Sequence, residues 1–275
     1  MFKPIHTLSP GAERLHKPCL IFFLLTWIAG SVVLWVNVDP VVASWIDSVL
    51  LLAATTCSLL GLARRLPVQN VLMTALVIAC IAAGVVSFGT ITGMPFGSFA
   101  FSGRMGAKMF GTLPWTVPLL WLVIILNARG VAELILRPWR RTEFYGYGVL
   151  GVACLLVVLL AFGLDPFAVK VKAFWIWKGG TSTLRWHTAP WMNFLGWWIT
   201  ALLALVFSVP WLINKRPGPE LADLDVLILW SLFNLWLALG HAAHQLWLPL
   251  GVTLGDGVMV TLLALGGMRA SPGKE

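Results

Sequence analysis

The stretch VLMTALVIACIAAGVVSFGT, residues 71–90, decides the fold, because none of its twenty residues carries a charge. A helix needs about 20 mainly apolar residues to cross the hydrocarbon core of a bilayer. Comparable apolar blocks recur along the 275-residue chain, in which 59% of the residues are hydrophobic and only 11% are charged. The sequence therefore predicts an all-α, polytopic membrane protein.

Seven or eight such blocks can be placed, and we expect them to form a single membrane domain over residues 1–275. The first block is too long for the core of a signal peptide and has no small-residue cleavage site after it, so we interpret it as a retained helix. The predicted spans are residues 19–38, 41–63, 71–90, 113–136, 144–164, 192–214, 225–240 and 251–268.

The basic residues are divided unevenly between the connections. With a cytoplasmic N-terminus, the inner group is Lys3, Arg14, Lys17, Arg64, Arg65, Arg137, Arg140, Arg141, Lys215, Arg216, Arg269 and Lys274. The outer group is Arg104, Lys108, Lys170, Lys172, Lys178 and Arg185. The positive-inside rule then favours eight spans with both ends inside, in a cytoplasmic membrane, whereas seven spans would place the C-terminus outside. Since these groups lie between apolar blocks, the net charge of +8 does not indicate a nucleic-acid partner.

Two connections differ from the others. Residues 91–111 and 165–191 are long, rich in aromatic side chains and interrupted by Gly and Pro, and both fall on the predicted outer side. Irregular segments as apolar as these are unlike solvated loops, so we expect them to lie at the membrane interface or to re-enter the bundle as a lid over a cavity.

The sequence lacks the motifs of the common soluble enzymes, among them the P-loop, the dinucleotide-binding turn, the zinc helix and the nucleophile elbow. We therefore expect no cofactor. His241 and His244 have a spacing that could place two imidazoles on one metal, but no carboxylate or cysteine lies nearby in the sequence, so no metal site is predicted. The four cysteines are interpreted as small core residues.

Ionisable residues inside a span are costly and are therefore candidates for function. Arg129 and Glu133, four residues apart, can pair on one helix face, most simply as a structural ion pair. Asp47 lies one turn into the second span, where it could donate a proton or bond to a neighbouring helix. Asp165 precedes Pro166, and such a pair is sufficient to end a helix.

The aromatic side chains point to a ligand. Many of the 16 tryptophans lie at predicted span ends, as an interfacial belt requires. Six others gather around the second long connection: Trp175, Trp177, Trp186, Trp191, Trp197 and Trp198. Their flat rings suit a conjugated or isoprenoid ligand, and they could stabilise a carbocation by cation–π attraction. His187 lies in the same connection, where it could relay protons or serve only as an interfacial side chain.

Several short runs resemble one known family. They are GTITGMPFG at residues 89–97, Leu113-Pro114 with Trp121, Leu164-Asp165-Pro166, Trp175-Ile176-Trp177, and Pro190 followed by NFLGW at residues 193–197. In this order, from about residue 84 to residue 200, they resemble the integral-membrane carotenoid biosynthesis protein family. That family includes carotenoid 1,2-hydratases acting on bacterioruberin and γ-carotene precursors.

The resemblance implies a hydratase that adds water to the terminal double bond of an acyclic carotenoid, with membrane lipids around it. Asp165 would be a catalytic carboxyl and His187 a relay. The residues expected to contact substrate are Phe96, Trp175, Trp177, Trp186, Asn193 and Trp197.

This chain also departs from the family pattern. Val86 and Ala161 stand where the family usually has Glu and Asp, and Ile91 stands where it has Arg. A second hypothesis is therefore a member without catalytic acids, which binds a carotenoid or other isoprenoid lipid as a subunit of a larger membrane complex.

Overall fold

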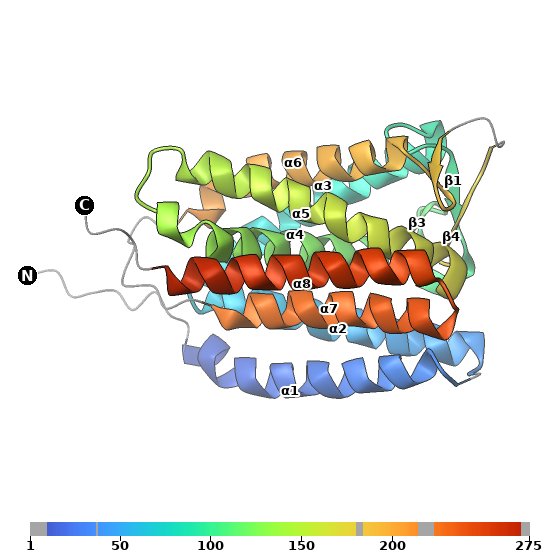
Figure 1. Ribbon diagram of the computed structural model, residues 1–275, viewed down its shortest axis with the longest axis horizontal. Helices are drawn as coiled ribbons and strands as arrows, with labels where there is room; N and C mark the ends of the chain where they lie inside the picture. The colour runs from blue at the N-terminus through green and yellow to red at the C-terminus, as the bar shows by residue number, and fades with distance from the viewer. Residues whose placement is uncertain (1–9, 37, 180–183, 214–222, 271–275) are drawn as a thin grey trace, which may run out of the picture.

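The computed structural model describes residues 10–36, 38–179, 184–213 and 223–270. In that part of the chain, eight helices are long and apolar enough to cross a membrane, and they lie side by side in one bundle (Figure 1). They are α1 (Pro10–Val33), α2 (Pro40–Ala63), α3 (Val68–Thr92), α4 (Thr116–Ile135), α5 (Tyr145–Pro166), α6 (Met192–Leu212), α7 (Leu224–Ala243) and α8 (Trp247–Arg269). This confirms the predicted polytopic all-α fold.

The helices differ in how far the protein itself covers them. In the most apolar window of α4, 61% of the residues are buried, whereas the values are only 17% for α1 and 22% for α8. In a membrane protein the remaining apolar surface faces lipid. The central helix is therefore α4, while α1 and α8 lie at the rim of the bundle.

One predicted boundary, the end of the fifth helix at Asp165 and Pro166, is wrong. Helix α5 includes both residues and continues through a π-helical turn, η3 (Phe167–Val171). A proline has no N–H for the carbonyl four residues earlier, which here belongs to Phe162. That carbonyl instead accepts a hydrogen bond from Trp186 Nε1 at 2.9 Å. A side chain from the following connection thus replaces the missing donor, and the helix carries Asp165 into the protein interior.

The first helix also begins earlier than predicted, at Pro10 instead of residue 19. Polar contacts with other helices account for its extra turns. The buried His16 Nε2 lies 2.7 Å from Asp225 Oδ2 on α7, and Glu13 pairs with Arg64 at 3.3 Å. Several residues used in the charge and span predictions lie outside the described residues: Lys3, Asn214, Lys215, Arg216 and Lys274.

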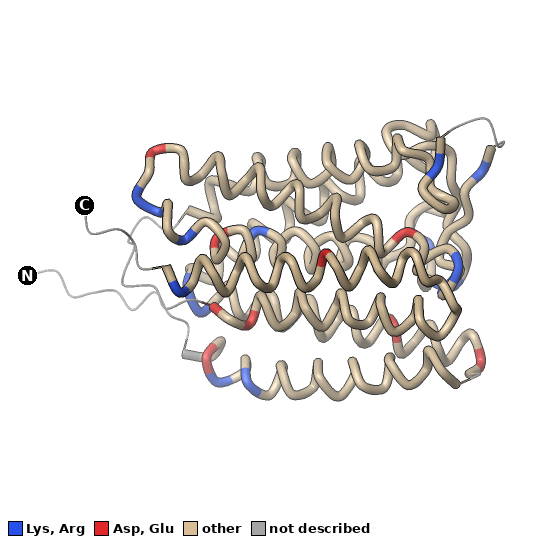
Figure 2. Tube along the Cα trace, viewed as in Figure 1, with Lys and Arg blue, Asp and Glu red and all other residues tan. Residues whose placement is uncertain are grey.

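The bundle has two unlike ends. We call the end where α1 begins and α8 finishes the terminal end, and the opposite end, which carries the β-strands, the ribbon end (Figure 1). Figure 2 shows that Lys and Arg gather near these two ends, while the middle of the bundle is mostly without them. This distribution is the one expected of a bundle whose middle lies in hydrocarbon.

The two long connections fold back on the ribbon end and pair with each other. Strand β1 (Phe99–Phe101) runs antiparallel to β4 (Trp175–Trp177), with Phe99 opposite Trp177 and Phe101 opposite Trp175. Two small hairpins complete this end, β2 (Lys108–Met109) with β3 (Leu113–Pro114) and β5 (Arg185–Trp186) with β6 (Ala189–Pro190). A short 3-10 helix, η1 (Gly103–Met105), lies in the first long connection, whereas a second, η2 (Arg137–Trp139), lies between α4 and α5 at the terminal end. Strand pairing thus satisfies the backbone polar groups on the facing edges of β1 and β4.

Candidate functional site

Asp165 is the meeting point of three side chains at the ribbon end. It is 0% exposed, and its Oδ1 accepts hydrogen bonds from Trp175 Nε1 at 3.1 Å and Trp177 Nε1 at 3.2 Å. Asn193 Nδ2 is a third, longer donor at 3.5 Å. Among the described residues, no lysine or arginine forms an ion pair with this carboxyl. Asp165 is therefore held by neutral donors only.

The local structure explains why these donors converge. Residues two apart in a strand face the same side, so β4 presents both of its tryptophans to the end of α5. Asn193 stands in the first turn of α6, and Trp197, one turn later, donates from Nε1 to Asn193 Oδ1 at 3.1 Å. An indole N–H can only donate, so the amide oxygen faces Trp197 and the amide nitrogen faces Asp165. The orientation of Asn193 is thereby fixed.

A small apolar cavity of about 40 Å³ adjoins this network. It is lined by Val86, Phe96, Phe99, Phe101, Met105, Val117, Leu120, Trp121, Trp175, Trp177, Asn193 and Trp197. Three of these residues, Trp175, Trp177 and Asn193, are the donors to Asp165. The carboxyl therefore lies directly behind the wall of an aromatic cavity.

Aromatic rings form most of the cavity wall. The rings of Trp121 and Trp197 are 4.5 Å apart between centroids and tilted by 30°. The ring centroids of Phe99 and Trp177 are 5.4 Å apart, and those of Phe101 and Trp175, which meet edge-on, are 6.2 Å apart. Rings that pack against each other in this way are stiff and present their faces or edges in fixed directions.

Phe96, one of the lining residues, packs between two helices. A Cβ atom built at Gly89 on α3 or at Gly196 on α6 would overlap the Phe96 ring. Both helices therefore approach this ring more closely than residues with side chains would allow. Packing around this phenylalanine therefore explains the first glycine of the run 89–97, Gly89, and the glycine of the run 193–197, Gly196.

The structure brings most of the predicted site together but leaves two residues apart from the network. Trp186 donates its N–H to the Phe162 carbonyl. His187 is exposed in the turn between β5 and β6. The centroid of its ring lies 5.1 Å from that of Trp186. Partial desolvation, and then the positive charge of Lys170, lower the pKa of His187. No hydrogen bond joins His187 to Asp165 in the described residues.

The other ionisable candidates have defined partners. Arg129 and Glu133 form the predicted ion pair, at 2.6 Å. Asp47 bonds to a neighbouring segment, because its Oδ1 lies 2.7 Å from Lys172 Nζ beyond the end of α5.

His241 on α7 and His244, which directly follows the end of α7, make separate contacts. His241 Nε2 is 3.0 Å from the Gly163 carbonyl, and His244 Nδ1 is 3.2 Å from the Gly240 carbonyl. Within the described residues, no group of three His, Cys, Asp or Glu side chains could hold a metal.

Comparison with known proteins identifies the family of this chain. The sequence model of a family described as "Carotenoid biosynthesis protein" matches residues 46–260. The chain belongs to the carotenoid biosynthesis protein family. It is also 27% identical over 188 residues to a bisanhydrobacterioruberin hydratase from Haloarcula japonica, an alignment that covers 65% of this chain and 59% of that relative. No solved structure matches the chain.

Within this member of the carotenoid biosynthesis protein family, Asp165 and the whole cavity lining lie inside the matched residues 46–260. Sequence reasoning missed part of that lining. Phe99 and Phe101 have the two-residue spacing of a strand, and this could have placed them on one face. Trp121 was predicted only as part of the family motif, not as a lining residue. Its position against Trp197 depends on how α4 and α6 pack.

Proposed function

We propose that this protein adds water to the terminal double bond of an acyclic carotenoid and leaves a tertiary alcohol. One observation carries the proposal: a fully buried carboxyl, Asp165, stands behind an aromatic cavity and is held there by two cavity-lining tryptophans. Family membership and the resemblance to a hydratase support the same reaction class.

The chemistry needs an acid, a place for a cation and a water molecule. In its protonated form, Asp165 gives its proton to the CH carbon of the terminal double bond, and the π electrons form the new C–H bond. The carbon that carries two methyl groups becomes a tertiary cation. A water oxygen then forms the C–O bond, and the excess proton of that water returns to the Asp165 carboxylate. The sum is addition of one water, with the acid regenerated.

The described residues supply the surroundings for this sequence. Indole faces stabilise a nearby cation by about 0.5–2 kcal/mol each, more when water is excluded. The tilted pair Trp121 and Trp197 supplies two such indole rings in the cavity wall. Asn193 makes the longest of the bonds to Asp165, at 3.5 Å, so we place the opening between carboxyl and cavity at this side chain. His187 stays a predicted relay between the aqueous phase and the site.

The proposed function also includes an orientation of the bundle in the membrane. We place the terminal end in the cytoplasm, with this protein in the cytoplasmic membrane, because the larger group of basic residues gathers there. A cysteine introduced at Leu184, at the ribbon end, should then react with an impermeant maleimide on intact cells, while one at Glu143, near the terminal end, should not. The reverse pattern would refute this orientation.

The reaction is tested by incubating the purified protein, in mild detergent, with an acyclic carotenoid that has an isopropylidene end. The expected product is heavier by one water. Asp165→Asn should lower the formation of this product at least about 100-fold, whereas Asp256→Asn on α8 makes the same chemical change outside the cavity and should leave product formation intact. Hydration at an undiminished rate in Asp165→Asn would remove this carboxyl from the mechanism.

A second function is favoured by Val86 and Ala161. Both are buried, and Val86 lines the cavity at a position where the resemblance implies a carboxylate. A member of this kind would bind a carotenoid without converting it, as a subunit of a membrane complex. Tightly bound but unchanged pigment in the purified protein, together with recovered partner chains, would support this function. Hydration that appears only in Val86→Glu would do the same.

A further inference from the structure

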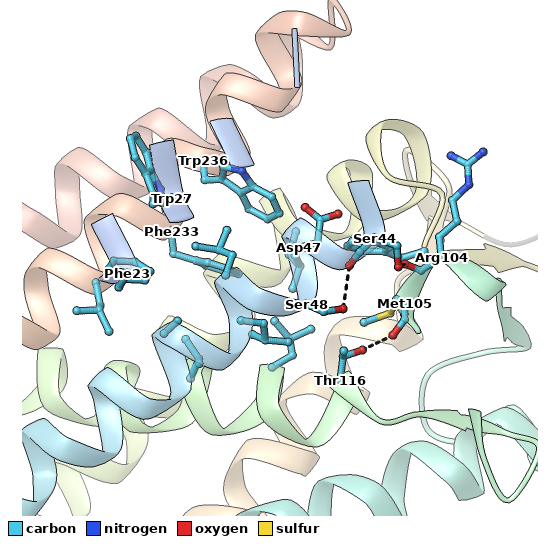
Figure 3. A pocket seen from close by; sticks show the side chains of 18 of the residues that line it. Phe23, Trp27, Ser44, Asp47, Ser48, Arg104, Met105, Thr116, Phe233 and Trp236 are labelled. Atoms are coloured by element: carbon cyan, nitrogen blue, oxygen red, sulfur yellow. Dashed lines mark hydrogen bonds between the residues drawn. The ribbon is translucent and has the colours of Figure 1, made fainter. Parts of the chain in front are cut away.

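Two cavities outside the Asp165 site differ in size and polarity. The cavity in Figure 3, between α1, α2, α4 and α7, measures about 70 Å³, and apolar side chains such as Phe23, Trp27 and Trp236 form most of its wall. A wider cavity of about 600 Å³ lies at the terminal end, among the ends of α2, α4 and α6 and the start of α5. We call it the terminal cavity. Its volume falls within the range of about 300–1,000 Å³ that is usual for ligand sites.

The terminal cavity spans the depth of the membrane interface. Along α6 its lining runs from Leu205 to Leu212, the last residue of the helix, a length of about 10 Å at 1.5 Å per residue. The interfacial layer of a bilayer is about 5–7 Å thick on each side, so the cavity reaches the edge of the hydrocarbon. Its innermost lining on α5 and α6, Leu150 and Leu205, is apolar. The two tyrosines of the chain, Tyr145 and Tyr147, line it at the start of α5, and tyrosine is enriched at the depth of the headgroups.

A row of charged side chains follows α4 and the short helix η2 after it. Arg129, Glu133, Arg137 and Arg140 succeed one another at intervals of four, four and three residues, and all line the terminal cavity. Such intervals keep side chains on one face of a helix. Arg129 is held by the ion pair with Glu133 and donates from Nη2 to the carbonyl of Leu212 at 3.3 Å. The inner half of the row thus joins α4 to α6, whereas its outer half, Arg137 and Arg140, lies nearer the end of the bundle.

The charges around the terminal cavity do not cancel. Its lining contains four guanidinium groups and three carboxylates, from Arg65, Arg129, Arg137, Arg140, Glu133, Glu143 and Asp223. Two of the carboxylates belong to ion pairs, Glu133 with Arg129 at 2.6 Å and Asp223 with Arg65 at 3.2 Å. The other charges are the two outer guanidinium groups and the exposed carboxylate of Glu143. One positive charge is therefore in excess, and a ligand with a single negative charge would balance it.

The start of α5 adds backbone donors to the same cavity. Helix α5 begins at Tyr145, and Tyr145, Gly146 and Tyr147 all line the cavity. The N–H groups of a first helical turn have no carbonyl partner within the helix. Among the described residues, the N-cap residue Phe144 forms no side-chain hydrogen bond to them. Because such N–H groups and the helix dipole attract anions, guanidinium groups and a helix start border one space.

We propose that the terminal cavity binds an anionic glycerophospholipid from the surrounding membrane. Its phosphate lies between the outer arginines, Arg137 and Arg140, and the start of α5, and an acyl chain lies against the apolar lining of α5 and α6. A guanidinium has five N–H donors, so each arginine can bond to a phosphate oxygen beside the contacts that it already makes. A zwitterionic lipid has the same phosphate, but its ammonium adds positive charge to a lining that already has an excess. Inorganic phosphate has no chain for the apolar lining.

Binding is measured without any carotenoid, because the terminal cavity lies at the opposite end of the bundle from Asp165 and does not depend on hydration. The delipidated protein in mild detergent is titrated with phosphatidylglycerol and with phosphatidylcholine of the same acyl chains, and bound lipids are counted by native mass spectrometry. We expect the first phosphatidylglycerol to bind roughly tenfold more tightly than the first phosphatidylcholine. Equal affinities would overturn the proposal. Displacement of the lipid by an equal concentration of inorganic phosphate would assign the arginines to a soluble anion and would also overturn it.

A pair of charge variants locates the phosphate. Arg137→Gln with Arg140→Gln removes both outer guanidinium groups and should reduce the preference for phosphatidylglycerol to about twofold or less. The matched control is Arg14→Gln with Arg269→Gln, which removes the same charge from exposed side chains of α1 and α8 at the same end, outside the cavity lining. This control should keep the preference. A preference that survives the first change, or one that is lost in the control, would refute the site.

A pair of glycine variants tests the cavity with every charge in place. A Cβ atom built at Gly146 or at Gly151, both on α5, meets nothing within 4 Å outside the adjacent backbone, so both positions have room for a larger side chain. Gly146 lines the terminal cavity and Gly151 does not. Gly146→Phe should therefore abolish the tight binding of phosphatidylglycerol, whereas Gly151→Phe should leave it unchanged. Equal binding by these two variants would contradict a ligand inside the cavity.

Discussion

Two aspartates near the ribbon end show how one residue type acquires different roles. Asp165 is fully buried and held by neutral indole and amide N–H groups, whereas Asp47 is paired with the ammonium of Lys172. A neighbouring cation favours the charged form of a carboxyl, while neutral donors leave its charge uncompensated. The proposed function gives Asp165 the exchange of a proton, whereas Asp47 is already engaged by the ammonium of Lys172.

The largest expected effect is on the rate of carotenoid hydration, which should differ between variants of the two aspartates. Asp165→Asn should lower the rate of carotenoid hydration by about 100-fold to 10,000-fold, the usual contribution of a general acid. Asp47→Asn with Lys172→Met should change it by less than about threefold, because the charge pair is removed as a unit and lies outside the lining of the aromatic cavity. Product is measured by mass at a fixed time in both proteins. Comparable losses in the two would erase the distinction between the aspartates.

The next effect concerns stability. Lys172→Met alone leaves the carboxylate of Asp47 buried without its cation, and this should destabilise the protein by about 3–5 kcal/mol. The double variant with Asp47→Asn should recover most of this loss. Unfolding in graded denaturing detergent, with the double variant as the matched control, measures both changes. A single variant as stable as the double variant would mean that the pair is not buried as described.

A smaller effect is expected on the Asp165 side. Trp177→Phe keeps an aromatic ring and removes one N–H from the carboxyl, which should cost about 1–3 kcal/mol of stability and reduce hydration about tenfold. Trp198→Phe is the control, since this half-exposed indole on α6 lies outside the cavity lining. Equal behaviour of the two variants would show that the N–H of Trp177 does not matter.

The smallest effect is a pH dependence at His187. Because the folded protein lowers the pKa of His187, the unfolded chain binds a proton at this residue more readily. The contribution of His187 to the free energy of unfolding is therefore fully present above about pH 6.5 and declines as the pH falls below that value. His187→Gln should remove this part of the dependence. Thermal unfolding measured between pH 5 and pH 8 checks the prediction, and identical curves would contradict it.

The sequence was sufficient for the spans because hydrocarbon imposes a length and a composition that can be read directly. It failed at Asp165 and Pro166, where local propensity ends a helix. The helix continues because Trp186, twenty residues further on, satisfies the carbonyl that the proline leaves without a donor. That contact joins segments distant in the sequence, so the residues around Pro166 do not predict it.

The candidate site was predicted in part for a similar reason. Aromatic density and motif resemblance identified Trp175, Trp177, Asn193 and Trp197, but not the hydrogen bonds that gather them on Asp165. Lys172 was assigned only to an outer loop, because nothing in its neighbourhood indicates that it would bury itself against Asp47 on α2. Pairing between distant segments depends on how the helices pack.

The pairing of β1 with β4 also sets an order of events during biosynthesis. Strand β1 leaves the ribosome before α4, and β4 leaves it only after α5, so the two strands meet once both intervening helices have been threaded into the bilayer. A nascent chain halted after α5 would already carry Asp165, without either of the indoles that hold it. The site is thus completed only when a later segment, β4, has been synthesised after the helix that carries the carboxyl.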